Sequence, residues 1–186
     1  MKNETDNIFL ENLIEKAIKK DEIAFTTLIH SIEQEMYRIA KIKLKNDDDI
    51  YEAIQNCIIL IYKNLKKLRN KEFFRTWAMR ILINECTKIL NKKKLNNERY
   101  TEYDENISNK DEEFEKIESK CDLQKLLNCL NENEKIVMTL YYGENFNTKE
   151  IADILSEPEG TIKSRISRAK IKIKEYIDKE DLYEKR

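Results

Sequence analysis

The chain has 186 residues, of which 38% are charged and 40% hydrophobic, and it contains only 2 glycines and 1 proline. So few turn-forming residues exclude an all-β sandwich or barrel, because those folds depend on many tight turns. The apolar fraction is still large enough for small hydrophobic cores. Composition therefore predicts an all-α protein.

The apolar runs and the cysteines argue against a membrane protein, a secreted protein and a metal-binding protein. The longest apolar run, Cys57–Tyr62, is too short to span a bilayer, and acids are mixed with the apolar pairs near the N-terminus. We therefore expect a cytoplasmic protein without membrane insertion or a secretory signal. The four cysteines lack C-x-x-C spacing, and His30 is the only histidine. We expect reduced cysteines that pack as small hydrophobes, and neither a metal site nor a cofactor.

The net charge of -1 is distributed unevenly along the chain. Residues 1–94 carry 19 Lys+Arg against 14 Asp+Glu, residues 95–118 carry 3 against 9, and residues 119–186 carry 13 of each. The acidic segment also lacks helical periodicity, and such a polar tract cannot bury enough surface to order itself. We expect a flexible acidic linker over 95–118 between two helical domains, 1–94 and 119–186. A stable helix over 111–118 is the alternative.

Apolar residues recur at helical spacing in several blocks before the linker. One stripe lies within 10–18 and a longer one within 25–39. Asn46 and the three aspartates after it can cap a third helix, from about Ile50 to Leu65. A fourth helix is expected from about Phe73 to Leu90. The N-terminal domain should therefore be a helical bundle.

Capping boxes predict where helices begin after the linker. Asn131 with Glu134 predicts a helix that ends at Gly143, which we expect in the left-handed conformation. Asn147 with Glu150 predicts a second helix of only about two turns.

A longer basic helix is expected to follow. Ser156 with Glu159 forms a third capping pattern, with Pro158 in the first turn, and predicts a helix to about Ile177. A short helix, a tight turn and a longer basic helix are typical of a helix-turn-helix.

The last helix has two faces of opposite character. Ile162, Ile166, Ala169 and Ile173 form a narrow apolar face that must pack on the preceding helices. The other face offers hydrogen-bonding and basic side chains, which suit base edges in the major groove and, further along, phosphates. A solvated basic helix is the alternative, and an outward-facing Ile171 suits neither interpretation. The polar face carries Lys163, Ser164, Ser167 and Arg168.

The stretch from Thr148 to Lys170 resembles region 4 of bacterial extracytoplasmic-function (ECF) sigma factors, whose pattern is EIA…L…P.GT(V/I)KSR..RA(R/K). The resemblance implies that this domain binds the minus-thirty-five promoter element. The residues implied in this contact are Thr148, Lys149, Gly160, Thr161, Lys163, Ser164, Ser167 and Arg168.

The N-terminal half resembles region 2 of the same family, in the segments 21–28, 49–55 and 74–84. The resemblance implies contacts with the minus-ten element, although Trp77 has an equal alternative as a core residue. It also implies contacts with the clamp helices of the polymerase β′ subunit, although the run 47–49 has an alternative as a helix cap. The implied minus-ten residues are Asn70, Arg75, Trp77, Arg80 and Asn84, and the implied polymerase-binding residues are Asp49, Glu52, Gln55 and Asn56.

Three positions depart from the family pattern. Asn56 and Cys57 replace a glutamate and a threonine, and Lys88 stands where an aspartate is common. These changes bear on polymerase affinity and promoter preference.

Taken together, the resemblance implies a sigma factor, and not an enzyme, that acts in response to an external or stress signal. Its implied partners are core RNA polymerase, through the β′ clamp helices and the β flap, promoter DNA and an anti-sigma factor. The alternative is a stand-alone helix-turn-helix regulator that binds duplex DNA as a dimer.

Overall fold

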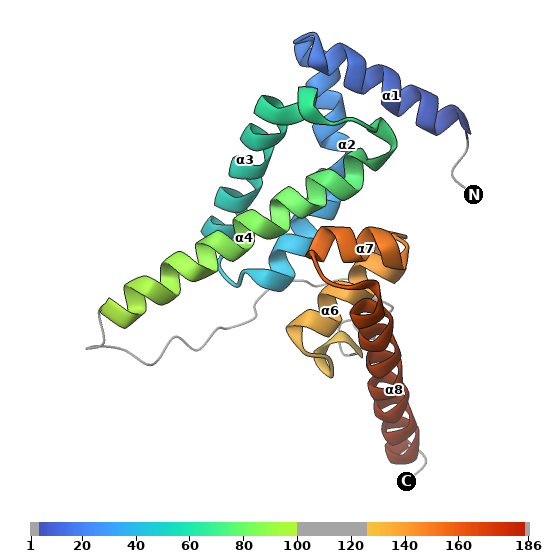
Figure 1. Ribbon diagram of the computed structural model, residues 1–186. Coiled ribbons are helices and arrows are strands. Elements are labelled where there is room, and N and C mark those ends of the chain that lie inside the picture. Colours follow the sequence, from blue (N-terminus) through green and yellow to red (C-terminus); the bar gives the residue numbers. More distant parts are fainter. Residues whose placement is uncertain (1–3, 100–125, 185–186) are drawn as a thin grey trace.

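The computed structural model describes residues 4–99 and 126–184, and within these ranges the regular elements are helices and no strand occurs (Figure 1). The all-α fold class predicted from composition is confirmed. Most of the predicted linker, and the alternative helix over 111–118, lie outside the described residues. The elements are α1 (Glu4–Ile18), α2 (Glu22–Lys43), α3 (Asp47–Asn64), the short 3-10 turns η1 (Leu65–Lys67) and η2 (Lys71–Phe73), α4 (Phe74–Arg99), α6 (Glu132–Met138), the π-helical turn η3 (Thr139–Gly143), α7 (Thr148–Leu155) and α8 (Glu159–Glu184).

The N-terminal helices form one bundle in which α1 packs on α2, and α2 and α3 both pack on α4 (Figure 1). Helix α2 begins where the Asp21 carboxylate accepts a hydrogen bond of 2.9 Å from the Ala24 N–H. Helix α3 begins where the Asn46 side chain accepts one of 2.8 Å from the Asp48 N–H. The apolar stripes predicted from periodicity face inward. Among the fully buried side chains are Ile14, Leu28, Ile32, Met36, Ile39, Ile61, Phe74, Met79 and Leu82.

Helix α4 is longer than expected, because it continues to Arg99 instead of ending near Leu90. Residues 91–95 are exposed, and Lys93 among them forms an ion pair with Asp49 of α3. The segment contains Lys, Asn, Leu, Glu and Arg but no Gly or Pro, and nothing in it terminates a helix. Figure 1 shows this end of α4 projecting beyond the bundle.

Two of the three capping patterns predicted in the C-terminal half are confirmed. At the start of α6 the Asn131 side chain accepts from the Glu134 N–H at 2.9 Å, and the Glu134 carboxylate accepts from the Asn131 N–H at 3.0 Å. The same reciprocal pair forms at the start of α7, between Asn147 and Glu150. These contacts involve residues only three apart, which is why the sequence alone predicts them.

Two details of the predicted turns are wrong. Gly143 does not adopt a left-handed conformation; the last turn widens into η3, and Asn145 takes the positive φ of 57°. Ser156 does not cap α8; it is the left-handed C-cap of α7, with φ of 55°. Asn is well suited to such a turn because its side chain can bond locally, whereas Ser156 is held there by its N–H bond to the Ala152 carbonyl.

The two halves of the chain contact each other. Helix α7 packs on α4, and α6 packs on α2. In Figure 1, α7 lies beside α4 at the lower right of the N-terminal bundle, while the second half of α8 extends away from the bundle.

Candidate nucleic-acid interface

Helices α7 and α8 form the predicted helix-turn-helix. The turn between them begins at left-handed Ser156, and the Glu157 N–H donates to the Ala152 carbonyl at 3.0 Å. The Thr148 hydroxyl, at the start of α7, donates to the Glu159 carboxylate at 2.7 Å and so joins the starts of the two helices. Hydrogen bonds from Lys163 and Thr148 hold the pKa of Glu159 below its usual value.

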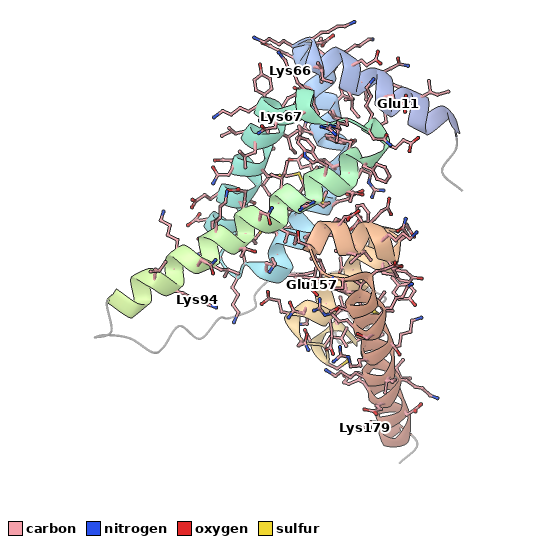
Figure 2. The ribbon with its side chains drawn as sticks, in the orientation of Figure 1. Glu11, Lys66, Lys67, Lys94, Glu157 and Lys179 are labelled. Carbon is pink, nitrogen blue, oxygen red and sulfur yellow. The ribbon has the colours of Figure 1, made fainter. Side chains whose placement is uncertain are left out.

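A bidentate ion pair fixes the turn on α8. The Arg165 guanidinium donates to both oxygens of Glu157, at 3.1 and 2.7 Å. The Arg165 side chain is only 15% exposed, so this arginine has a structural position in the turn. Figure 2 labels Glu157 at the junction of α7 and α8. The sequence indicated a basic residue here but carried no signal for its partner.

The outward face of α8 is open to solvent near its N-terminus. Ser164, Ser167 and Arg168 are exposed, and Gly160 has no atom within 4 Å of the place where a Cβ would stand. Within the described residues Arg168 makes two long hydrogen bonds, of 3.3 Å to the Ser164 carbonyl and 3.4 Å to its hydroxyl. Its guanidinium can therefore leave these contacts for a stronger acceptor.

Other predicted minus-thirty-five residues have contacts within the domain. Lys163 is exposed and lies 2.9 Å from Glu159, one helical turn back. Thr148 and Thr161 are half-buried, and Lys149 is exposed. The exposed members of the set thus lie on α8 and at the first turn of α7.

Lys172 anchors α8 on α6. Its ammonium donates to both oxygens of Glu134, at 2.8 and 2.9 Å, and the Glu134 side chain is buried. Burial raises the pKa of Glu134, but the hydrogen bonds from Lys172 and from the Asn131 N–H outweigh it and leave the pKa below its usual value. The sequence predicted that basic side chains further along this helix contact phosphates, and it carried no signal for this structural contact of Lys172.

Four of the five predicted minus-ten residues lie on one face of α4 or in the turn before it. Asn70 is exposed and caps η2, where its side chain accepts from the Glu72 N–H at 3.2 Å. Trp77 is half-buried and packs against the core, with its ring centroid 6.4 Å from that of Phe74. Arg80 and Asn84 are exposed on α4.

A cleft of about 390 Å³ adjoins this face between α3 and α4. It is lined by Leu60, Ile81 and Asn84 among others, and Lys88 stands at its rim with its ammonium 2.6 Å from buried Glu85. The lysine that departs from the family pattern is therefore paired within the bundle.

Arg75, the remaining minus-ten candidate, lies between the two halves of the chain. Its guanidinium donates to both carboxylate oxygens of Glu35 and to the Glu144 carbonyl at 3.2 Å, and it stacks 4.7 Å from the centre of the Phe146 ring. Burial raises the pKa of Glu35, against the lowering effect of Arg75. The structure separates Arg75 from the exposed minus-ten candidates.

The four predicted polymerase-binding residues share one face of α3. Glu52 and Gln55 are exposed, and Asn56 is half-buried. The Asp49 side chain is 14% exposed and forms an ion pair with Lys93 of α4. Glu52 and Gln55 are thus the members of the set most accessible to a partner.

The cysteines of the bundle pack in its core. Cys57 and Cys86 are buried, burial raises the pKa of both thiols, and the Cys57 thiol donates to the Ala78 carbonyl at 3.6 Å. Cys121 lies outside the described residues. Among the described residues, no helix combines the length and apolarity that crossing a membrane requires.

Two family models match this chain, one in its N-terminal helical bundle and one in its C-terminal helix-turn-helix domain. Residues 28–95 match the family model for sigma-70 region 2, and residues 122–173 match the model for sigma-70 region 4. The RNA polymerase sigma factor SigV of Bacillus subtilis is 30% identical over 156 residues, which cover 84% of this chain and 92% of SigV.

Two solved structures share the fold. RpoE of Bartonella quintana, solved in complex with the anti-sigma factor NepR, superimposes with a TM-score of 0.66 at 19% identity over 83% of this chain and 96% of RpoE. CnrH, solved in complex with the cytosolic domain of CnrY, gives a TM-score of 0.63 at 17% identity over 91% of this chain and 97% of CnrH.

Proposed function

Because the chain belongs to the ECF sigma factors of the sigma-70 family, it directs core RNA polymerase to promoters, and we propose which of its surfaces makes each contact. Sigma factors are initiation factors and not enzymes. The observation that carries the function is the ordered pair of region 2 and region 4 within one chain. The stand-alone dimeric regulator gains no support from these relatives.

The outward face of α8 is the proposed reader of the minus-thirty-five element. Exposed Ser164, Ser167 and Arg168 offer donors and acceptors of the kind that base edges in the major groove match. Arg165 and Lys172 are paired with buried or half-buried carboxylates, so they position α8 on its domain. Gly160 leaves open space where the helix start would approach the phosphate backbone.

The exposed edge of α4 and η2 is the proposed reader of the minus-ten element. Opening of the duplex exposes single-stranded bases, which positive charge and aromatic faces can hold. Arg80 and Asn84 are exposed there, and Asn70 stands at the neighbouring turn. Trp77 packs against the core, so its proposed role is to position this edge rather than to stack on a base.

The exposed face of α3 is the proposed contact with the polymerase β′ clamp helices. Glu52 and Gln55 supply its accessible acceptors, and the adjoining pair of Asp49 and Lys93 orders the end of the surface. The C-terminal domain is the proposed partner of the β flap. The proposed location is the cytoplasm, where the polymerase acts, and the proposed regulator is an anti-sigma factor that responds to an external or stress signal.

Reconstituted transcription tests the proposal for α8. Core polymerase with this protein is expected to initiate at defined promoters, and Ser164→Ala with Ser167→Ala should alter which minus-thirty-five sequences are used. Glu175→Gln, further along α8 and exposed, serves as the control. An unchanged sequence preference in the double variant would overturn the assignment of this face.

A further inference from the structure

We propose that Glu159 opposes DNA binding by α8, because its carboxylate holds two side chains that would otherwise contact DNA phosphates. The two side chains are those of Thr148, at the start of α7, and Lys163, on α8. The proposal rests on the proposed function, because it requires α8 to face DNA. It adds to that function a residue that sets how strongly the helix binds DNA of any sequence.

One carboxylate oxygen of Glu159 contacts both side chains. The Thr148 hydroxyl donates to Glu159 Oε1 at 2.7 Å, and the Lys163 ammonium lies 2.9 Å from the same oxygen. A carboxylate oxygen has lone pairs for two such donors. The acid thus joins the first turns of the two helices of the helix-turn-helix, and both donors are already paired in the absence of DNA.

Glu159 carries its negative charge at neutral pH and lies among cations. Hydrogen bonds from Lys163 and Thr148 hold its pKa below the usual value, and the charges of Lys163 and Lys149 lower the pKa further. Thr148, Lys149 and Lys163 all belong to the set of residues implied in contact with the minus-thirty-five element. The acid therefore faces the same groups that DNA phosphates would contact.

A DNA phosphate must compete with this carboxylate. Sequence-independent affinity for DNA comes from lysines and arginines that neutralise phosphates. A lysine paired with an acid contributes less of this attraction, and the acid repels a phosphate that approaches the same place. The Lys163 side chain is 63% exposed and that of Glu159 is 31% exposed, so the pair is accessible to an incoming phosphate. Glu159 should therefore weaken binding to every sequence, while Arg168 distinguishes between sequences.

An ion pair with a purely structural role would have the opposite effect on DNA binding. Lys172 pairs with Glu134, whose side chain is buried, and this contact holds α8 on its domain. Loss of such a structural acid should disturb α8 and weaken DNA binding. Loss of the competing carboxylate of Glu159 should strengthen it. The sign of the change in affinity therefore distinguishes the two roles.

Glu159→Gln tests the proposal, because its amide oxygen can still accept from the Thr148 hydroxyl while the negative charge is lost. Fluorescence anisotropy measures binding of the full chain to a labelled duplex of arbitrary sequence at about 50 and about 150 mM salt. At the lower salt the variant is expected to bind about 3- to 10-fold more tightly than wild type. Its salt slope should steepen by at most about 0.9, the value for one phosphate.

Two further variants make the test specific. Glu175→Gln makes the same charge change at an exposed position further along α8, and it should change the affinity by less than about twofold. In a Lys163→Gln background the gain from Glu159→Gln should also fall below about twofold, because the masked cation is gone. Far-UV circular dichroism checks that each variant keeps the helicity of wild type, and Glu159→Ala is measured if Glu159→Gln does not.

Weaker or unchanged binding by Glu159→Gln would overturn the proposal, as would an equal gain with and without Lys163. Absence of binding by both wild type and variant at the lower salt would also overturn it. Binding that is measurable only for the variant counts as the expected gain. If Glu159→Gln binds more tightly while wild type directs no transcription by core polymerase, the proposed function fails and the role of Glu159 stands. Normal transcription without any gain removes the role of Glu159 alone.

Discussion

Lys172 and Glu134 connect the recognition helix to the start of α6 through two hydrogen bonds, of 2.8 and 2.9 Å, to a carboxylate that also completes a capping box. One side chain therefore determines both where α6 begins and how α8 sits on it. Because α8 presents the proposed promoter-reading face, this buried contact bears on DNA binding without touching DNA.

Glu134→Gln should lower the free energy of unfolding of the C-terminal domain by about 1.5–3 kcal/mol at neutral pH, the range for hydrogen bonds to charged groups. Glutamine can still accept the capping bond, so the loss reflects mainly the ion pair with Lys172. Urea denaturation followed by circular dichroism measures it. The matched control is Glu150→Gln in the capping box of α7, which should have a smaller effect; equal losses would mean that capping alone explains both.

Glu134 should also make the stability of the C-terminal domain depend on pH. The pKa of Glu134 is lower in the folded protein than in the unfolded chain, so its stabilisation is fully present above the unfolded value and is lost as the pH falls through the folded value. The stability difference between wild type and Glu134→Gln should therefore be constant near neutral pH and shrink below about pH 4. A difference that stays constant down to pH 2.5 (about two units below the ordinary value) would contradict the assignment.

Arg168 and Lys174 are both exposed on α8, and we expect them to contribute differently to DNA binding. Arg168 is expected to read a base, and Lys174 to contact phosphate. Arg168→Ala should relax specificity at one position of the minus-thirty-five element by about 1–3 kcal/mol. Lys174→Ala should weaken binding evenly and reduce the salt slope by at most about one unit. Binding to promoter variants at two salt concentrations tells them apart, and an even loss for Arg168→Ala would show that α8 is oriented differently.

Replacing Arg165 and replacing Arg168 are expected to change the stability of the domain by different amounts. Arg165→Ala removes the bidentate partner of Glu157 and should destabilise the domain by about 1–3 kcal/mol, whereas exposed Arg168→Ala should stay within about 0.5 kcal/mol of wild type. Thermal denaturation of the two variants makes the comparison. Equal stabilities would remove the structural role assigned to Arg165.

On α3, Glu52→Lys should weaken binding to core polymerase while leaving helicity and stability unchanged, because Glu52 is exposed. Asp49→Lys should weaken binding too, but it also loses the pair with Lys93 and should reduce stability. Pull-down with core enzyme and thermal denaturation separate the two effects. Glu33→Lys on the exposed face of α2 is the control, and equal binding by all three variants would exclude this face of α3.

The parts of this structure that the sequence predicted are those set by local interactions. The capping boxes at Asn131 and Asn147 form between residues three apart, and the apolar stripe of α8 follows from helical periodicity. Ser156 resembled a third cap, but the turn between α7 and α8 requires a left-handed residue there, and tertiary geometry overrides the local pattern.

The ion pair between Arg38 of α2 and Glu144, in the turn before α7, could not be predicted in the same way. Arg38 and Glu144 are 106 residues apart, and nothing in either local sequence distinguishes them from solvated charges. The end of α4 was misjudged for a related reason. Its lysines after Leu90 suggested a helix terminus, yet no residue there breaks the helix before Arg99.

The most direct test of the central claim is transcription by core RNA polymerase, with and without this protein, on a library of random promoters. The account predicts discrete start sites only when the protein is added, with shared sequences near minus ten and minus thirty-five. Absence of any specific transcript above core enzyme alone, together with binding of the purified protein as a dimer to palindromic duplex DNA, would contradict it.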